Sequence, residues 1–160
     1  MKDTILERLR STLKGAPFSS SEFRGELTLH VRKADLVAVC TFLRDDPALQ
    51  FVMLMDMCGV DYYRRDDRYE VVYNLYSLKN KFRLRLKVGV DEGDLRVPSV
   101  SSLWPGAAWH EREAFDMYGI QFENHPDLRR IYMPDDFEYH PLRKDFPLMG
   151  IPGSLPLPPK

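Results

Sequence analysis

The segment from Phe82 to Val90 alternates apolar and polar side chains over nearly its whole length, and this pattern most narrows the choice of fold. One face of such a strand would carry Phe82, Leu84, Leu86, Val88 and Val90, and the other Arg83, Arg85 and Lys87. A two-faced strand of this kind predicts a sheet with one face in a hydrophobic core. We interpret the basic row as a solvated face or a guarded sheet edge, and favour this over a phosphate-binding stripe.

Other segments have the residue pattern of further strands. Strands are predicted at 27–31, 51–55 and 69–78. The second of these is a continuous apolar run, which predicts a strand covered on both faces. The Ser-rich stretch 17–25 is expected to be a loop.

Two segments have apolar residues at helical spacing, and a third is closed by a glycine. Helices are predicted at 4–14, 34–43 and 109–118. Thr4 and Glu7 form a capping-box pattern at the first helix, and Gly119 is a natural stop for the third. The order of helices and strands indicates an α+β domain with one sheet and its helices on one face.

Length and composition predict a single globular domain over residues 1–146. The 160 residues are 44% hydrophobic, and no window is apolar enough for a membrane span. The N-terminus carries acids and is not expected to be a signal peptide, so the cytoplasm is the simplest compartment. A net charge of −1 gives no basic surface for nucleic acid. Residues 147–160 hold five prolines and two glycines, which predicts an extended docking tail.

The chain has two cysteines, Cys40 and Cys58, and no CxxC pair. A bridge between them is compatible with their spacing, but we expect both to be buried thiols. Two thiols are too few to hold an iron–sulfur cluster.

The region from residue 109 to 147 is dense in ionisable side chains. Glu113 and Asp116 stand three residues apart, so their carboxylates share one face of the predicted helix. Such a pair can serve acid–base catalysis or bind a metal. We favour the alternative that the two carboxylates hold basic side chains; the candidates are Arg112, Arg129, Arg130 and Arg143.

Other catalytic and binding motifs are missing from the sequence. His110, His125 and His140 lack the close spacing of a zinc-chelating pair, and HExxH does not occur. No GxSxG nucleophile motif and no phosphate-binding glycine loop is found. The tyrosines between positions 62 and 76 are expected to pack in the sheet rather than to stack on nucleic acid. The mixture of arginines, acids and aromatic residues instead indicates a protein-binding surface.

Three stretches closely resemble the signature of the small hydrophilic subunit of respiratory complex I, the NADH:quinone oxidoreductase. They are WHEREAFDMYG at 109–119, HPDLRRI at 125–131 and HPLRKDFPL at 140–148. Shorter upstream blocks are also similar to family blocks: VPSV at 97–100, LWP at 103–105, LMD at 54–56 and VDY at 60–62.

The resemblance implies a two-layer α/β domain with a mixed sheet of about five strands. It implies a non-catalytic peripheral-arm subunit that supports assembly and the quinone-site subunit, while the complex transfers electrons from NADH to quinone and translocates protons. The expected partners are the large hydrogenase-like subunit of the quinone site and the neighbouring iron–sulfur subunits. FMN and iron–sulfur clusters are expected in those partners, and no cofactor or metal in this chain. The expected location is peripheral, on the cytoplasmic side of the inner membrane.

The resemblance also marks the family-motif residues and the expected partner interface. They are Glu111, Arg112, Glu113, Asp116, Gly119, His125, Pro126, Arg129, Arg130, His140, Pro141, Arg143, Lys144, Asp145 and Pro147. We expect the charged members to form buried ion-pair and hydrogen-bond networks, within the domain and against partners. Tyr139 departs from the family, which often has glycine there, so we expect a differently shaped turn.

Two rival functions are consistent with the same residues. One is the equivalent subunit of a membrane-bound hydrogenase or of a ferredoxin- or quinone-linked relative, although LRKDFP at 142–147 favours the NADH-type complex. The other is a free-standing acid–base hydrolase or lyase that uses Glu113, Asp116 and the histidines. Turnover by the isolated chain would identify the second.

Overall fold

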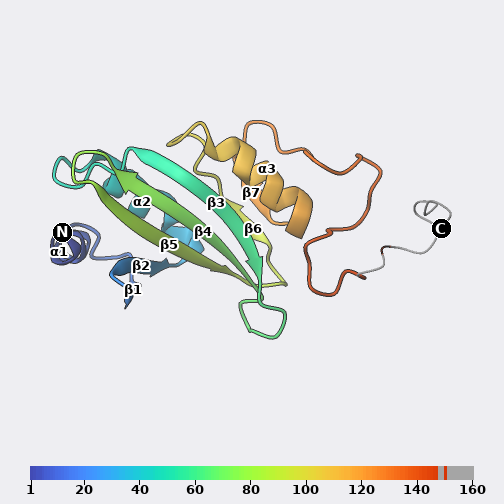
Figure 1. The fold of residues 1–160 in the computed structure, drawn as a ribbon, viewed down its shortest axis with the longest axis horizontal. Coiled ribbons are helices and arrows are strands. Elements are labelled where there is room, and N and C mark those ends of the chain that lie inside the picture. Colours follow the sequence, from blue (N-terminus) through green and yellow to red (C-terminus); the bar gives the residue numbers. More distant parts are fainter. Residues whose placement is uncertain (148–149, 151–160) are drawn as a thin grey trace.

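A mixed sheet of five strands forms the centre of the structure, a computed structural model that describes residues 1–147 and residue 150. The strands are β1 (Phe18–Phe23), β2 (Glu26–Val31), β3 (Met53–Asp61), β4 (Tyr69–Ser77) and β5 (Phe82–Val90), in the spatial order β1-β2-β5-β4-β3 (Figure 1). Only the β2–β5 pair of this sheet is parallel. The predicted α+β class and mixed sheet are confirmed.

Two helices cover one face of the sheet. They are α1 (Lys2–Thr12) and α2 (Leu36–Asp45), the latter preceded by the short 3-10 helix η1 (Lys33–Asp35). The apolar row of α2 is buried at Leu36, Val39, Cys40 and Leu43, and it shares one core with the apolar row of β5. Each fully buried aliphatic side chain contributes about 1.5–3 kcal/mol. The apolar face predicted for β5 is therefore the face that forms the core.

The basic row of β5 lies on the opposite, outer face of the sheet. There Arg85 binds Glu26 and Lys87 binds Glu70, each pair at 2.7 Å. The prediction of a solvated face is confirmed for this row. The prediction of a guarded edge is wrong, because β5 lies between β2 and β4 in the middle of the sheet.

The stretch predicted as a loop at 17–25 contains strand β1. Its side chains are mostly exposed, so the strand is held by backbone pairing to β2 and leaves no apolar pattern in the sequence. Arg24 and Gly25 form the tight turn, with positive φ angles of 50° and 84°. Two consecutive residues with positive φ are typical of the turn that matches the twist of a hairpin.

Strand β3 differs from the prediction at 51–55 in both place and cover. It runs from Met53 to Asp61 at the edge of the sheet, and its register shifts between Leu54 and Asp56. Val52, Met53 and Met55 are 48%, 45% and 41% exposed, so the predicted cover on both faces is wrong for this chain.

Two smaller predictions in the N-terminal half also fail. The capping box of Thr4 and Glu7 is wrong, because α1 begins at Lys2 after Met1, without a side-chain cap. Both cysteines are free thiols; Cys40 is buried as predicted, whereas Cys58 is exposed on β3.

A second, small sheet follows the main one and was not predicted. Strands β6 (Arg96–Pro98) and β7 (Gln121–Glu123) pair in parallel, and helix α3 (Ala107–Tyr118) connects them. Three-residue strands are too short to show a periodic pattern in the sequence. Helix α3 lies alongside edge strand β3 (Figure 1). It ends at Tyr118, before Gly119, as predicted.

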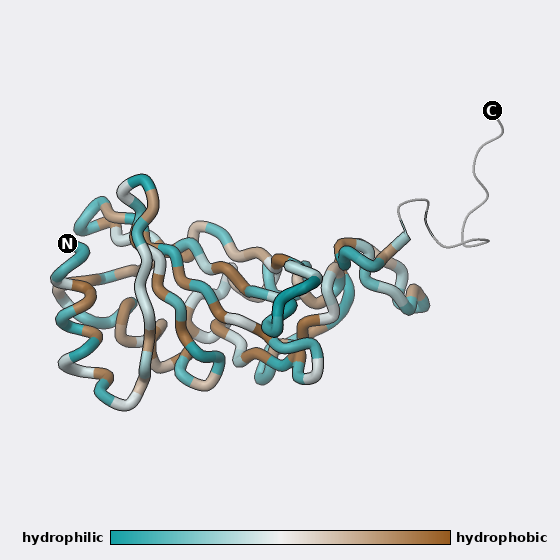
Figure 2. Tube along the Cα trace, turned by 90° about the horizontal axis from the view of Figure 1, so that it is seen from below, coloured by the Kyte–Doolittle hydropathy of each residue, from teal (hydrophilic) through white to brown (hydrophobic). Residues whose placement is uncertain are grey.

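The described residues after β7 contain no helix or strand. They lie at the end of the long axis opposite α1, as both views of the chain show, with polar and apolar residues mixed along the segment (Figures 1 and 2). The predicted docking tail at 147–160 lies outside the described residues except for Pro147 and Gly150. Within the described residues, every helix is too short or too polar to span a lipid bilayer.

Candidate functional site

Helix α3 positions most of the motif residues, and Gly119 fixes where it ends. Gly119 has a φ of 80°, and a Cβ there would lie 2.5 Å from Arg143 Nη2 and 2.7 Å from His140 Nε2. Only glycine suits both the left-handed backbone and this close approach. The chain that follows can therefore return along the C-terminal end of α3.

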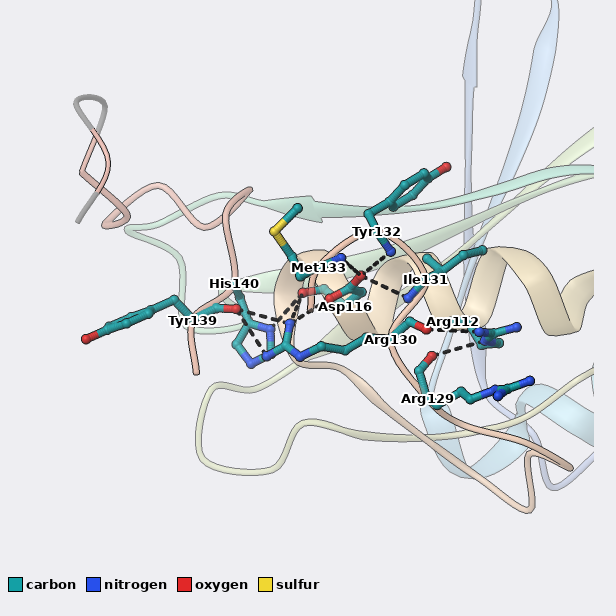
Figure 3. Close-up of polar contacts among 9 residues, drawn as sticks. All are labelled: Arg112, Asp116, Arg129, Arg130, Ile131, Tyr132, Met133, Tyr139 and His140. Atoms are coloured by element: carbon teal, nitrogen blue, oxygen red, sulfur yellow. Dashed lines mark hydrogen bonds and ion pairs between the residues drawn. The ribbon is translucent and has the colours of Figure 1, made fainter. Parts of the chain in front are cut away.

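Asp116, in the last turn of α3, is fully buried and holds the segment that begins at Arg130 (Figure 3). Its Oδ2 accepts hydrogen bonds from the backbone N–H groups of Ile131, Tyr132 and Met133 at 3.0, 2.7 and 2.9 Å. Its Oδ1 accepts one from Arg130 Nη1 at 2.6 Å.

These donors keep the Asp116 carboxyl ionised. Burial alone would raise the pKa of the Asp116 carboxyl, but the three backbone N–H groups and Arg130 outweigh burial and hold the pKa below its usual range. An ionised carboxylate therefore fixes a segment that has no regular structure of its own.

Arg112 and His140 extend this attachment in both directions along the chain (Figure 3). The Arg112 guanidinium donates to the carbonyl oxygens of Arg129 and Arg130, at 3.0 and 2.9 Å. His140 Nδ1 lies 2.9 Å from the carbonyl oxygen of Asp116, which can only accept, so Nδ1 carries the proton. Burial lowers the pKa of His140, which favours the neutral ring.

Glu111, one turn earlier in α3, is equally buried but has neutral partners. Its Oε2 accepts from Ser99 Oγ at 2.6 Å, and its Oε1 accepts from the Val100 N–H at 2.8 Å. Burial raises the pKa of Glu111 despite these two hydrogen bonds and a histidine close by. Glu111 thus attaches α3 to the chain just after β6.

His125 is the histidine beside Glu111, with Nε2 3.8 Å from Oε2 and a side chain only 1% exposed. Its Nδ1 accepts from the Asp127 N–H at 2.9 Å, and its Nε2 lies 3.0 Å from the Ala108 carbonyl oxygen. These partners fit a neutral ring with the proton on Nε2. His125 therefore fixes a turn rather than presenting a free nitrogen.

A second set of contacts holds the last motif onto the main sheet. Arg68 is 6% exposed; its guanidinium binds Asp61 through Nε and Nη2, at 3.1 and 3.0 Å, and Nη2 also lies 3.0 Å from Asp145 Oδ1. Asp61 Oδ2 accepts from the Lys144 N–H at 2.7 Å, and Arg143 Nε donates to the Tyr118 carbonyl oxygen at 2.7 Å. Residues 143–145 are therefore part of the folded domain.

Sequence reasoning missed Arg68, the centre of this second set. Its carboxylate partners Asp61, Glu92 and Asp145 lie on both sides of it in the sequence, so no local spacing marks it. Asp61 falls in the VDY block of the family resemblance, which was the available signal for this network.

The structure brings together most of the predicted motif residues but separates the predicted carboxylate pair. Asp116 is buried and bound to Arg130 as expected, whereas Glu113 is exposed, with no ion pair or hydrogen bond recorded among the described residues. Within the domain Glu113 joins no buried network among the described residues, because its side chain is exposed to solvent whereas that of Asp116 is buried. The exposed side chain of Arg129 binds only Asp127 among those residues, at 2.9 Å.

The remaining motif positions shape the backbone. Pro126 and Pro147 are exposed and Pro141 is partly exposed, and each stands in an irregular part of the chain. Tyr139 has no positive φ, so its turn does not need the glycine of the relatives. In residues 1–147 and 150, no cluster of three or more His, Cys, Asp or Glu side chains is arranged to hold a metal ion.

These networks can fix the chain, but they do not offer a reactive pair. The buried oxygens of Asp116 and Glu111 are taken up by hydrogen bonds from the chain itself. The geometry therefore gives no support to an acid–base site built on Glu113 and Asp116, which requires both carboxylates to face one substrate.

The family model described as "Respiratory-chain NADH dehydrogenase, 30 Kd subunit" matches residues 29–152. A similar protein is a subunit of the NADH-quinone oxidoreductase of Roseiflexus sp. (strain RS-1), 58% identical over 145 residues, which are 91% of this chain and 83% of that protein.

Two solved structures have a similar fold. A trypsin-resistant fragment of Nqo5 is 34% identical, with a TM-score of 0.67 over 79% of this chain and 98% of the fragment. A chain of the membrane-bound sulfane sulfur reductase, an archaeal respiratory membrane complex, has a TM-score of 0.74 over 92% of this chain and 86% of its own. At 21% identity, this second likeness supports the fold alone.

Proposed function

The chain belongs to the family of the 30 kDa subunit of respiratory-chain NADH dehydrogenase, and on this premise we propose that it is a non-catalytic subunit in the peripheral arm of an NADH:quinone oxidoreductase. The complex transfers electrons from NADH to quinone and couples this to proton translocation. This subunit supports assembly of the arm and of the large subunit that forms the quinone site.

One observation supports the proposal that this chain has no active site of its own. The motif side chains that are buried, Glu111 and Asp116, bind donors of the chain itself and hold irregular segments in place. A buried hydrogen-bonded carboxylate of this kind gives a segment one fixed shape, which is what a docking subunit requires. The redox groups, FMN and the iron–sulfur clusters, then belong to partner subunits.

The partners follow from the same proposal. The large hydrogenase-like subunit of the quinone site and the neighbouring iron–sulfur subunits contact this chain on the cytoplasmic side of the membrane. The C-terminal residues after Phe146 serve as the docking arm for the large subunit. The contacts of Arg143, Lys144 and Asp145 with the domain support this division, because they fix the point where such an arm begins.

The experiment is purification of the full chain, alone and from membranes with its partners. The isolated chain is expected to show no flavin or cluster absorbance and no NADH oxidation, whereas the tagged chain from membranes brings an NADH:quinone oxidoreductase with it. Stoichiometric iron or flavin in the isolated chain would contradict the proposal. Failure to recover the oxidoreductase would also contradict it.

Truncation after Phe146 tests the arm. The melting temperature is expected to stay nearly unchanged, because the anchoring residues 143–145 are retained, while recovery of the large subunit falls. A second variant with glycine at the five prolines of 147–160 keeps the length and removes the restriction that proline places on the backbone angle φ. If the truncated and full-length chains recovered equal amounts of the large subunit, the residues after Phe146 would have no docking role.

A further inference from the structure

The start of edge strand β3 and the neighbouring side of α3 expose a group of apolar side chains, here called the β3–α3 patch. Its members are Val52, Met53, Met55, Cys58 and Trp109. Trp109 is 62% exposed, the largest apolar side chain in the group. Exposed apolar groups gathered on adjacent elements mark interaction sites more often than exposed residues scattered singly.

Contacts between the two elements show that strand β3 and helix α3 lie side by side next to these side chains. The Asp56 carboxylate Oδ1 on β3 lies 3.8 Å from His110 Nδ1 on α3. Gly59 on β3 leaves room for the ring of Tyr118, which a Cβ would approach to 2.6 Å. Glu113 stands one helical turn after Trp109, and with Asp56 it adds to the effect of burial in raising the pKa of the Cys58 thiol.

Two carboxylates beside the patch, Asp56 and Glu113, have no strong basic partner in the part of the chain that the structure describes. Among the described residues, neither Asp56 nor Glu113 forms an ion pair with a lysine or arginine; Asp56 has only His110. Two bases on the same outer face of the sheet are engaged, Arg85 by Glu26 and Lys87 by Glu70. Arg112 is also engaged, since its guanidinium lies 5.0 Å from the Trp109 ring centroid and donates to the carbonyl oxygens of the 129–130 segment.

The shape of the strand edge decides how a partner can contact it. The register shift between Leu54 and Asp56 interrupts the regular spacing of the free backbone groups of β3. Helix α3 also borders the strand near Asp56 and Gly59. Addition of a partner strand is therefore disfavoured, and contact through side chains is favoured.

We propose that the β3–α3 patch is the surface on which a neighbouring subunit of the complex docks, through a segment that brings a lysine or arginine between Asp56 and Glu113 and apolar side chains onto Trp109 and the methionines. This inference rests on the proposed function. The tryptophan is the expected anchor, because buried aromatic residues carry much of the energy of interfaces. The two carboxylates select the basic residue and set the orientation.

Cys58 gives a direct test, because the only other cysteine, Cys40, is buried. A maleimide reagent should label Cys58 in the isolated native chain. In the complex recovered through a tag on this chain, labelling should slow about tenfold or more. A Ser20→Cys variant on the opposite edge strand β1 reports a surface outside the patch and should label at similar rates in both samples.

Charge reversal gives a second, independent test. Glu113→Lys should reduce recovery of the complex about tenfold, while the melting temperature of the isolated chain stays unchanged because Glu113 is exposed. Glu7→Lys on α1 is the matched control, since Glu7 is also an exposed helical glutamate, and it should not reduce recovery.

The outcomes separate this inference from the proposed function. If the chain recovers the oxidoreductase while Cys58 labels as fast as in the isolated chain, the patch is not a docking surface. The proposed function then still stands. A chain that recovers no oxidoreductase overturns the function as well. A concentration-dependent dimer of the isolated chain that protects Cys58 overturns the choice of partner, because a second copy then occupies the patch.

Discussion

Helix α3 carries two fully buried carboxylates whose surroundings are opposite. Glu111 has two neutral donors and a neutral histidine nearby, and burial raises its pKa. Asp116 has three backbone donors and a guanidinium, and these lower its pKa although burial acts in the other direction. Both side chains are shielded from solvent, but the charge-assisted donors outweigh the effect of burial on the pKa at Asp116, whereas the neutral donors at Glu111 do not.

The opposite pKa shifts of the two carboxylates correspond to the chain segments that they bind. Glu111 binds the chain at Ser99 and Val100, next to strand β6, where Val100 is itself buried in the core. Asp116 binds residues 130–133, which have no helix or strand and little apolar burial. A segment without its own packing needs the stronger, charge-assisted hydrogen bonds.

Asn in place of Asp116 should have the largest effect. The amide cannot accept from both the backbone N–H groups and Arg130, because its nitrogen is a donor. We expect a loss of about 3 kcal/mol in the free energy of unfolding, measured by urea denaturation at pH 7. Trypsin should also cut faster after Arg129 and Arg130. Glu113→Gln on the exposed side of α3 is the control, with a change within about 0.5 kcal/mol; equal effects of the two variants would show that the donors do not matter.

Acid should remove the stabilisation that the Asp116 carboxylate gives to the folded state. Its folded pKa lies below the unfolded value of 3.8, so its stabilisation is present above pH 3.8 and is lost as the pH falls through the folded pKa. The stability difference between the wild type and Asp116→Asn should therefore shrink from pH 7 to pH 3. Urea midpoints across this range measure it, and a constant difference would argue against an ionised Asp116.

Ala in place of Ser99 tests the weaker site. It removes one of the two donors to Glu111 and leaves a buried oxygen without a partner, which we expect to cost about 1–2 kcal/mol in unfolding free energy. Ser101→Ala is the matched control, because Ser101 contacts the Ser99 hydroxyl at 2.7 Å but not Glu111. A larger loss at Ser101 than at Ser99 would count against this account of the site.

Gln in place of Glu111 should have the smallest effect, under about 1 kcal/mol at pH 7. Its carbonyl oxygen can accept from Val100, and its amide nitrogen can donate to Ser99 Oγ. The folded pKa of Glu111 is raised above the unfolded 4.5, so its stabilisation is complete below pH 4.5 and is lost as the pH rises through the folded pKa. The variant should therefore gain on the wild type between pH 4 and pH 8; a loss as large as that of Asp116→Asn would end the contrast between the two sites.

The strands and helices that form the core could be predicted from their residue patterns. Strand β5 and helix α2 each bury a periodic row of apolar residues, and that period is visible in the sequence. The glycine that ends α3 is visible there as well. Strand β1 could not be predicted, because it buries almost nothing and depends on the backbone of β2. The exposed first part of β3 was misjudged because an apolar run looks the same whether a second layer of this chain or another protein covers it.

The sequence indicated which residues belong to the candidate site, but not which of them contact one another. The motif resemblance marked Glu111, Asp116, Arg130 and His140, yet it gave no reason to separate Glu113 from them. The sequence did not indicate Arg68, because its partners Asp61, Glu92 and Asp145 come from distant parts of the chain.

The sequence by itself determined the class of the fold, the two-faced central strand and the membership of a family, because periodicity and motif spacing are local properties of the chain. Only the tertiary structure decided which carboxylates are buried, in which direction the pKa of each is shifted and which apolar side chains remain uncovered. Those properties depend on donors, cations and packing surfaces brought together from residues far apart in sequence, and a pKa responds to that assembled surrounding rather than to its neighbours in the chain.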